Sequence, residues 1–176
     1  GAALFFLQDV FLLHPESLPL DYNYGFKDPY KEHFIDYDSS TRFSIVQFTV
    51  PDSIPKKGSV IYCHGNMDNV IHYAEYANRF TRQGYDVWMM DYPGFGKSTG
   101  AFTEQVVYHE VQEVYNLVRA SGTAPAGIII YGKSLGTGIA AQLASVNSCR
   151  RLILECPYFS IRYLAAGYAW MYPAKK

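Results

Sequence analysis

The chain has 176 residues, of which 49% are hydrophobic and 18% are charged. This length and hydrophobic content are enough for one globular domain with a sizeable core. Fifteen Lys and Arg residues against sixteen Asp and Glu residues leave a net charge of −1, and no basic run is interleaved with aromatic residues. This balance argues against a nucleic-acid partner. Cys63, Cys149 and Cys156 form no C-x-x-C pair, so they predict no metal or cofactor site, and Cys63 and Cys156 are expected to be buried.

The first residues form an apolar run, Gly1 to Leu7, which ends at Gln8 and Asp9 and is too short to cross a bilayer. Such a run is typical of the end of an anchor or signal segment, or else of an ordinary first strand or helix. We assign residues 1–34 to an anchor remnant and a Pro- and Tyr-rich surface wrap, and residues 35–176 to the N-terminal portion of a single domain. The localisation stays open between a membrane-anchored or exported protein and a cytoplasmic one.

The middle of the chain alternates strand and helix patterns. The alternation from Ile35 to Val50 predicts an antiparallel hairpin, and two short runs rich in β-branched and aromatic residues predict buried strands at residues 59–63 and 85–90. Apolar residues at helical spacing predict a helix over residues 70–82.

A second helix is predicted to begin after Thr103, a natural N-cap. Its inward stripe consists of valines at helical spacing: Val107, Val111, Val114 and Val118. Glu104, Glu110, Glu113 and His109 are expected to fall mainly on the outer side, which favours a solvated face over a metal cluster. Further strands are predicted at residues 128–131 and 151–156, with a helix between them.

The run of β-branched residues at 128–130 leads directly into Gly132-Lys133-Ser134-Leu135-Gly136. A serine in the pattern G-x-S-x-G lies on a sharp turn between a strand and a helix, which holds its hydroxyl clear of the backbone. A side chain at Gly132 or Gly136 would collide where the strand and the helix pass closest. Ser134 is therefore the candidate nucleophile.

Two other patterns overlap this stretch. Residues 127–134 satisfy the phosphate-loop pattern G-x-x-x-x-G-K-[ST], but the intervening Ile-Ile-Ile-Tyr favours a buried strand over an anion-binding loop. Gly136-x-Gly138-x-x-Ala141, with Glu155 further on, is a loose dinucleotide fingerprint that begins too late after its strand.

Two further motifs follow predicted strands. His64-Gly65-Asn66 comes after residues 59–63, and Asp91-x-x-Gly-x-Gly-x-Ser comes after residues 85–90. Together with the serine motif, and in this order, they resemble the α/β-hydrolase superfamily, and most of all its membrane-anchored ABHD-type serine hydrolases. The resemblance implies an α/β fold: a mostly parallel sheet with helices on both faces, antiparallel strands at the N-terminus, and the last two strands of the family's usual eight missing.

The resemblance also implies roles for single residues. Ser134 would attack an acyl carbonyl, and the backbone N–H groups of Leu135 and Asn66 would hold the oxyanion. Gly65 would let the backbone approach, and His64 is interpreted as a positioning residue rather than as the general base. Asp91 would brace its own loop.

The implied substrate is a small acyl ester or thioester. The resemblance implies no cofactor, metal or nucleic-acid partner, and it implies that a segment before residue 1 associates the protein with a membrane. Activating a serine needs a histidine and an acid, which follow the serine in this superfamily. All five histidines precede Ser134, and Glu155 is the only carboxylate after it. The favoured explanation is that the acid and histidine lie beyond Lys176; the alternatives are a non-catalytic scaffold or a nucleotide binder.

Overall fold

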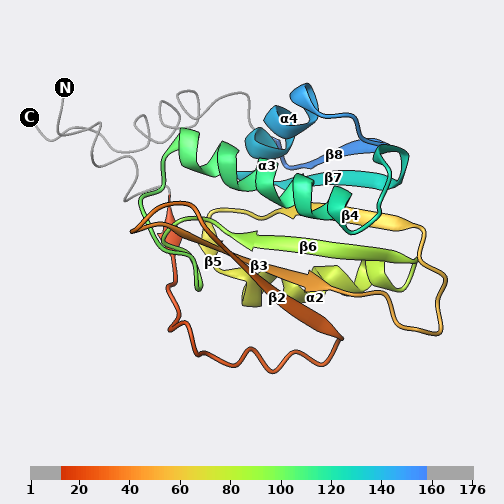
Figure 1. The fold of residues 1–176 in the computed structure, drawn as a ribbon, viewed down its shortest axis with the longest axis horizontal. Coiled ribbons are helices and arrows are strands. Elements are labelled where there is room, and N and C mark those ends of the chain that lie inside the picture. The colour runs from red at the N-terminus through yellow and green to blue at the C-terminus, as the bar shows by residue number, and fades with distance from the viewer. Residues whose placement is uncertain (1–12, 158–176) are drawn as a thin grey trace, which may run out of the picture.

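The structure, a computed structural model, describes residues 13–157 (Figure 1). These residues form short and long strands, three α-helices and a 3-10 turn at Pro125–Gly127. The strands are β1 (His14–Pro15), β2 (Tyr30–Asp36), β3 (Arg42–Phe48), β4 (Gly58–Cys63), β5 (Met67–Asp68), β6 (Tyr85–Asp91), β7 (Ile128–Lys133) and β8 (Arg151–Glu155). The helices are α2 (Val70–Thr81), α3 (Glu104–Ala120) and α4 (Gly136–Val146).

Six strands form one sheet in the order β2-β3-β6-β4-β7-β8. β3 is antiparallel to both of its neighbours, whereas β6, β4, β7 and β8 pair in parallel. This arrangement confirms the predicted α/β class, with a mostly parallel sheet and antiparallel strands at the N-terminus. Because β4, β6 and β7 run in the same direction, the loops that follow them meet at one edge of the sheet.

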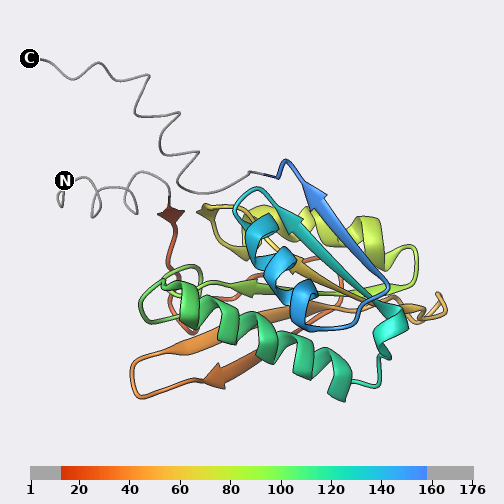
Figure 2. The ribbon, with the colours of Figure 1, turned by 90° about the horizontal axis from the view of Figure 1, so that it is seen from above.

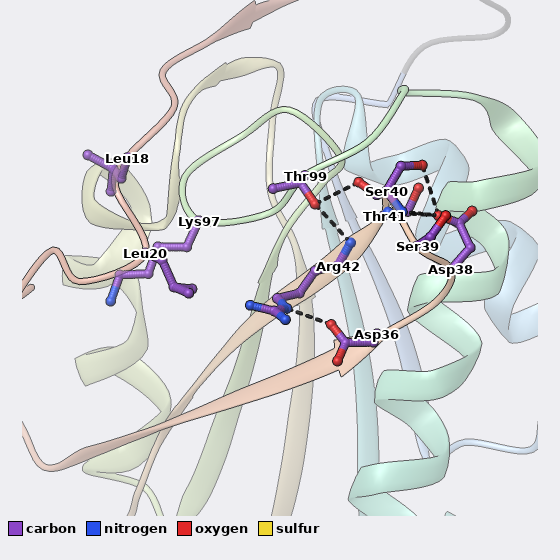
Figure 3. A pocket seen from close by; sticks show the side chains of 10 residues that line it. All are labelled: Leu18, Leu20, Asp36, Asp38, Ser39, Ser40, Thr41, Arg42, Lys97 and Thr99. Carbon is purple, nitrogen blue, oxygen red and sulfur yellow. Dashed lines mark hydrogen bonds and ion pairs between the residues drawn. The ribbon is translucent and has the colours of Figure 1, made fainter.

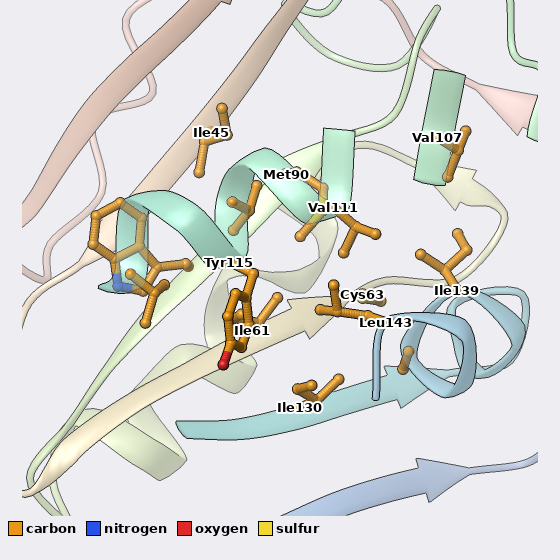
Figure 4. Close-up of a cluster of buried hydrophobic side chains, with 14 of the residues drawn as sticks. Ile45, Ile61, Cys63, Met90, Val107, Val111, Tyr115, Ile130, Ile139 and Leu143 are labelled. Carbon is orange, nitrogen blue, oxygen red and sulfur yellow. The ribbon is translucent and has the colours of Figure 1, made fainter. Parts of the chain in front are cut away.

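Helices cover both faces of the sheet, as predicted (Figure 2). α2 packs on one face, where Val70, Tyr73 and Ala77 join an apolar cluster with β3, β4 and β6. α3 and α4 pack on the other face (Figure 4). The predicted valine stripe of α3 is buried there, which confirms residues 107, 111, 114 and 118 as its inward side.

Glu110 was expected on the outer side of α3, and this expectation is wrong. The residue is 0% exposed, because it lies one helical turn before Val114 on the buried stripe. Its burial raises its pKa well above the ordinary value, and the charge of Asp91 adds to the effect. The helical spacing allowed this position, but a carboxylate is so seldom buried without a partner that the sequence favoured solvent.

The N-terminal part of the described chain includes two strands. β2 begins at Tyr30 and so includes residues 30–34, and β1 pairs in parallel with β5 as a separate two-stranded sheet. Strands of two residues carry no periodic pattern, so the sequence did not predict this pair. Cys63 is buried as expected, but Cys156 is exposed, because it follows the outermost strand β8. The apolar run at residues 1–7 lies outside the described residues.

Candidate functional site

Ser134 lies in the two-residue turn between β7 and α4. Its φ is +49°, in the left-handed region that non-glycine residues seldom adopt, and its side chain is exposed. Hydrogen bonds hold this conformation: the Ser134 carbonyl accepts from Thr137 N at 2.9 Å and from Thr137 Oγ1 at 2.6 Å. Ser134 N donates to the carbonyl of Glu155 at 2.9 Å, which extends the pairing between β7 and β8 beyond the strand end.

The two glycines that flank Ser134 lie where backbones nearly touch. A Cβ on Gly132 would lie 2.5 Å from the carbonyl oxygen of Gly136 and 2.7 Å from the Cβ of Ala140. A Cβ on Gly136 would overlap the carbonyl of Cys63 and lie 2.6 Å from that of His64. Larger residues would therefore push α4 away from β4 and β7, and with it the turn that carries Ser134.

The loop after β4 lies directly beside Ser134. A Cβ built on Gly65 would lie 3.7 Å from the Cβ of Ser134 and 2.7 Å from the hydroxyl of Tyr73. The absence of a side chain at Gly65 thus lets this loop approach the serine. Asn66, the next residue, is half-buried at the same edge of the sheet.

His64 is 0% exposed and lies between aromatic rings, with ring centroids 4.9 Å from Tyr73 and 4.3 Å from Tyr92. Its Nδ1 lies 2.7 Å from the carbonyl oxygen of Gly65. A carbonyl can only accept, so Nδ1 carries the proton in this bond. Burial lowers the pKa of His64 to about 4, and the ring is therefore neutral at neutral pH.

The bond from His64 fixes the direction of an N–H group. The Gly65 carbonyl and the Asn66 N–H belong to one peptide group, and no peptide bond among residues 13–157 is cis. In a trans peptide these two groups point in opposite directions. His64 therefore holds the carbonyl on its own side and directs the Asn66 N–H to the other.

Leu135 is the N-cap residue of α4. The N-terminal end of a helix carries the positive end of its dipole, so an anion beside Ser134 is favoured there. Ser134 thus lies between the start of α4, which begins after Leu135, and the loop after β4, which contains Gly65.

Asp91, at the end of β6, is 1% exposed and accepts a hydrogen bond from Val70 N at 2.7 Å. It also accepts from the backbone of Lys97 in its own loop, while burial raises its pKa to about 7. The side chain thus joins the loop after β6 to the first residue of α2. This geometry is that of a structural brace.

Comparisons with known proteins identify the family. The family model described as "Serine aminopeptidase, S33" matches residues 54–174. The chain belongs to this family, and with it to the α/β-hydrolase superfamily. Alpha/beta hydrolase domain-containing protein 17C of Xenopus tropicalis is 32% identical over 104 residues, which make up 58% of this chain and 34% of that protein. The chain therefore spans about a third of the length of the curated relatives it matches.

Solved structures agree on the fold. An α/β hydrolase from Vibrio vulnificus superimposes with a TM-score of 0.64 at 19% identity, covering 95% of this chain and 68% of that one. A soluble variant of monoglyceride lipase from Saccharomyces cerevisiae gives a TM-score of 0.56 at 20% identity, covering 78% and 47%. The α/β-hydrolase fold expected from the motifs is confirmed.

Two of the histidines of this α/β-hydrolase chain, His33 and His72, make contacts away from Ser134. His33 stacks on Trp88 and bonds Gln47 at 2.9 Å, and His72 lies 3.0 Å from Asp68. Within residues 13–157 the Ser134 hydroxyl has no hydrogen-bond partner, and no group of three or more His, Cys, Asp or Glu side chains is placed to hold a metal. In the same residues no helix is both long and apolar enough to cross a membrane.

Glu155 contacts residues of β7. Its carboxylate bonds the Lys133 ammonium and the Tyr131 hydroxyl, and the Lys133 contact lowers its pKa. The sequence did not indicate this cluster, because it depends on the register that places Glu155 opposite Lys133.

The phosphate-loop alternative fails on the same register, whereas the residues of the dinucleotide pattern, 136–141, lie within helix α4. Residues 128–133 form a strand whose amides pair with β4 and β8 rather than facing an anion. Tyr73, whose ring stacks on His64 and whose hydroxyl lies beside Gly65, is another residue at the site that the sequence did not indicate.

A separate hollow of about 180 Å³ lies between the N-terminal segment and the β2–β3 turn, lined by Leu18, Leu20, Asp36, Asp38, Ser39, Ser40, Thr41, Arg42, Lys97 and Thr99 (Figure 3). Its charged groups already have partners: Arg42 pairs with Asp36 at 2.6 Å, and Asp38 accepts from Ser40 N at 2.8 Å. None of the residues around Ser134 lines this hollow.

Proposed function

We propose that Ser134 is the nucleophile of a serine hydrolase that cleaves carboxylic esters or thioesters. The observation that supports it best is the left-handed backbone of Ser134, which presents an exposed hydroxyl between the N-terminus of α4 and the loop at Gly65. A strained, exposed serine at the start of a helix suits attack on an acyl carbonyl.

In this mechanism Ser134 Oγ forms a bond to the acyl carbon and loses its proton to a histidine. The tetrahedral oxyanion accepts hydrogen bonds from the N–H groups of Asn66 and Leu135. Its collapse breaks the bond to the leaving group, which takes the proton from the histidine and departs as an alcohol or a thiol, and leaves an acyl-enzyme. Water then releases the acid. We place the histidine and its acid in the part of the full-length protein that this chain does not span.

The substrate class rests on the motifs and on the names of similar proteins. A monoglyceride lipase shares the fold, and it supports an ester substrate, whereas the family description names an aminopeptidase. Acyl esters, acyl thioesters and an aminoacyl p-nitroanilide are therefore tested side by side on the full-length protein. Hydrolysis of the anilide alone would reject the ester assignment.

The nucleophile is tested with a fluorophosphonate probe. The full-length protein is expected to be labelled at Ser134, as found by peptide mass spectrometry, and Ser134→Ala is expected to lose the label. A folded wild-type protein that reacts neither with the probe nor with any ester would favour the non-catalytic scaffold instead.

We also propose that a segment before residue 1 associates the full-length protein with a membrane, on the basis of the apolar run at residues 1–7, which is typical of the end of such a segment. Fractionation should then recover it with membranes, from which detergent but not high salt releases it. Recovery in the supernatant would contradict this part of the proposal.

A further inference from the structure

An extended segment near the N-terminus is bonded to the loop that carries Asn66. We call residues 14–18 the N-terminal strap. β1 lies against β5, where His14 N donates to the Asn66 carbonyl at 2.9 Å and Glu16 N donates to the Asp68 carbonyl at 3.0 Å (Figure 1). β5 belongs to the loop after β4, so the strap is paired directly with the loop beside Ser134.

The strap also bonds the loop that follows β6. The Glu16 carbonyl accepts from Gly96 N at 2.8 Å and from Asn69 Nδ2 at 3.2 Å, and Leu18 N donates to the Gly96 carbonyl at 2.7 Å. Asn69 is 1% exposed, and its Oδ1 caps α2 by accepting from Ile71 N at 2.9 Å. One segment therefore connects the two loops at the ends of β4 and β6 to the start of α2.

The peptide groups on both sides of Asn66 are held by different parts of the molecule. The Gly65 carbonyl is bonded by the His64 ring at 2.7 Å, and the Asn66 carbonyl by the strap at 2.9 Å. Two residues further on, Asp68 has a φ of +56°, in the left-handed region that few residues other than glycine, asparagine and aspartate adopt. The loop therefore depends on external bonds to keep its conformation, and the strap supplies one at Asn66 and one at Asp68.

We propose that the N-terminal strap is a positioning segment that keeps the Asn66 N–H directed at the oxyanion. The proposal rests on the proposed function of Ser134. The hydrogen bond from Asn66 is used fully only when the oxyanion forms, so a loosened loop lowers kcat and leaves KM nearly unchanged. The His14 side chain is exposed, so this residue acts through its backbone, including the N–H that bonds the Asn66 carbonyl.

The test compares His14→Pro, which removes the N–H donor to Asn66, with His14→Ala, which keeps it. Both are made in the full-length protein, and kcat and KM are measured with a p-nitrophenyl ester. We expect kcat of the proline variant to be about tenfold or more below that of the alanine variant, with KM within about twofold, as for weakening one oxyanion donor. Equal kcat values in two folded variants would overturn the proposal.

Thermal unfolding and near-ultraviolet circular dichroism report whether the variants fold. If His14→Pro does not fold, Glu16→Pro against Glu16→Ala repeats the comparison at the bond to Asp68. Unfolding of both proline variants would make the strap a support of the whole domain and would overturn its positioning role. Absence of labelling at Ser134 in the wild-type protein would reject the proposed function and the strap proposal together. If the wild type is labelled but the Pro and Ala variants have equal kcat values, only the strap proposal is rejected.

Discussion

Single residues at the carboxyl edge of the sheet combine strain, burial and close approach. Ser134 adopts a left-handed backbone, Gly65 leaves room beside it, and His64 lies in the core underneath. Each of these features is unfavourable or restrictive by itself, and such features concentrate where a protein positions reacting groups. Their convergence on one side of Ser134 is the structural basis of the proposed chemistry.

The role of His64 is tested by replacing it with Asn, which can still donate to the Gly65 carbonyl, and with Phe, which cannot. We expect kcat for an ester to fall about tenfold or more in His64→Phe and less in His64→Asn, because only the amide restrains the peptide that carries the Asn66 N–H. Steady-state kinetics on the full-length protein measure the effect. Equal losses in two folded variants would contradict a positioning role.

The same residue predicts how stability depends on pH. Burial lowers the pKa of His64 from 6.5 to about 4, so its neutral ring contributes stability above pH 6.5 that is lost as the pH falls toward 4. Asn does not titrate. The free energy of unfolding of wild type relative to His64→Asn should therefore drop by about 3 kcal/mol between pH 7 and pH 4. Asp91 changes stability with pH in the opposite direction, but it does so equally in wild type and His64→Asn. If urea denaturation gives the two proteins parallel curves of unfolding free energy against pH, the lowered pKa of His64 is refuted.

Glu110 predicts the opposite pH dependence. Both of its carboxyl oxygens are buried without a hydrogen-bond partner among the described residues, and its pKa is raised well above 4.5. The stability of the protonated form is present below pH 4.5 and is lost as the pH rises through the folded pKa. Glu110→Leu should therefore raise the free energy of unfolding by about 1–3 kcal/mol, and by more at pH 8 than at pH 5. Glu75→Leu, at an exposed position on α2, is the control; a gain at Glu110 that does not change with pH would argue against a protonated carboxyl.

At the scale of elements, helix α3 is held on the sheet by the valine stripe that its sequence predicts. Thr103 caps it by accepting from Val106 N at 3.3 Å, and the four valines pack between β3, β4, β6 and α4. The stripe explains which side of α3 faces the sheet. Helix stability here comes from tertiary burial more than from intrinsic propensity.

Shortening one valine tests this packing. Val111 is 1% exposed, so Val111→Ala should lower the free energy of unfolding by about 2 kcal/mol through lost burial and a small cavity. Val146 at the end of α4 is 65% exposed, and Val146→Ala should change it by less than about 0.5 kcal/mol. Urea denaturation measures both, and equal effects would mean that α3 is not held by this stripe.

At the scale of the whole molecule, the described sheet ends at β8, whose Leu152 and Leu154 are 37% and 39% exposed. The chain spans about a third of the length of its curated relatives. We therefore expect β8 to be covered in the full-length protein by residues outside the described range 13–157, since apolar strands at a sheet edge are otherwise prone to association.

In the full-length protein, Leu154→Asp is then expected to lower the free energy of unfolding by about 2 kcal/mol or more, because a charge would be placed in an apolar contact. Val146→Asp, at the more exposed site, should have a much smaller effect. Equal and small effects of the two substitutions, measured by thermal and urea denaturation, would show that β8 remains open to solvent.

Local sequence patterns predicted most of the fold. The alternation around the hairpin, the buried strands at residues 59–63 and 85–90 and the valine stripe of α3 all agree with the structure, because each depends on residues close together in the chain. Glu110 and Cys156 were placed wrongly, since burial depends on which other elements arrive from elsewhere. The nucleophile assignment to Ser134 stays a prediction until the labelling experiment is done.

The sequence by itself determined most strands and helices and the three motifs at the carboxyl edge, because hydrophobic period, glycine placement and capping residues act over a few neighbouring positions. The resemblance carried by those motifs implied the fold class. Only the tertiary structure decided that the strap at residues 14–18 joins the two loops, that His64 turns the Gly65 carbonyl, and that Lys133 meets Glu155. The strap and the Lys133–Glu155 pair join segments that are far apart in the sequence and share no pattern that predicts their contact. The His64 contact is set by local backbone angles. All of these contacts are fixed only when the sheet register and the loop conformations form together.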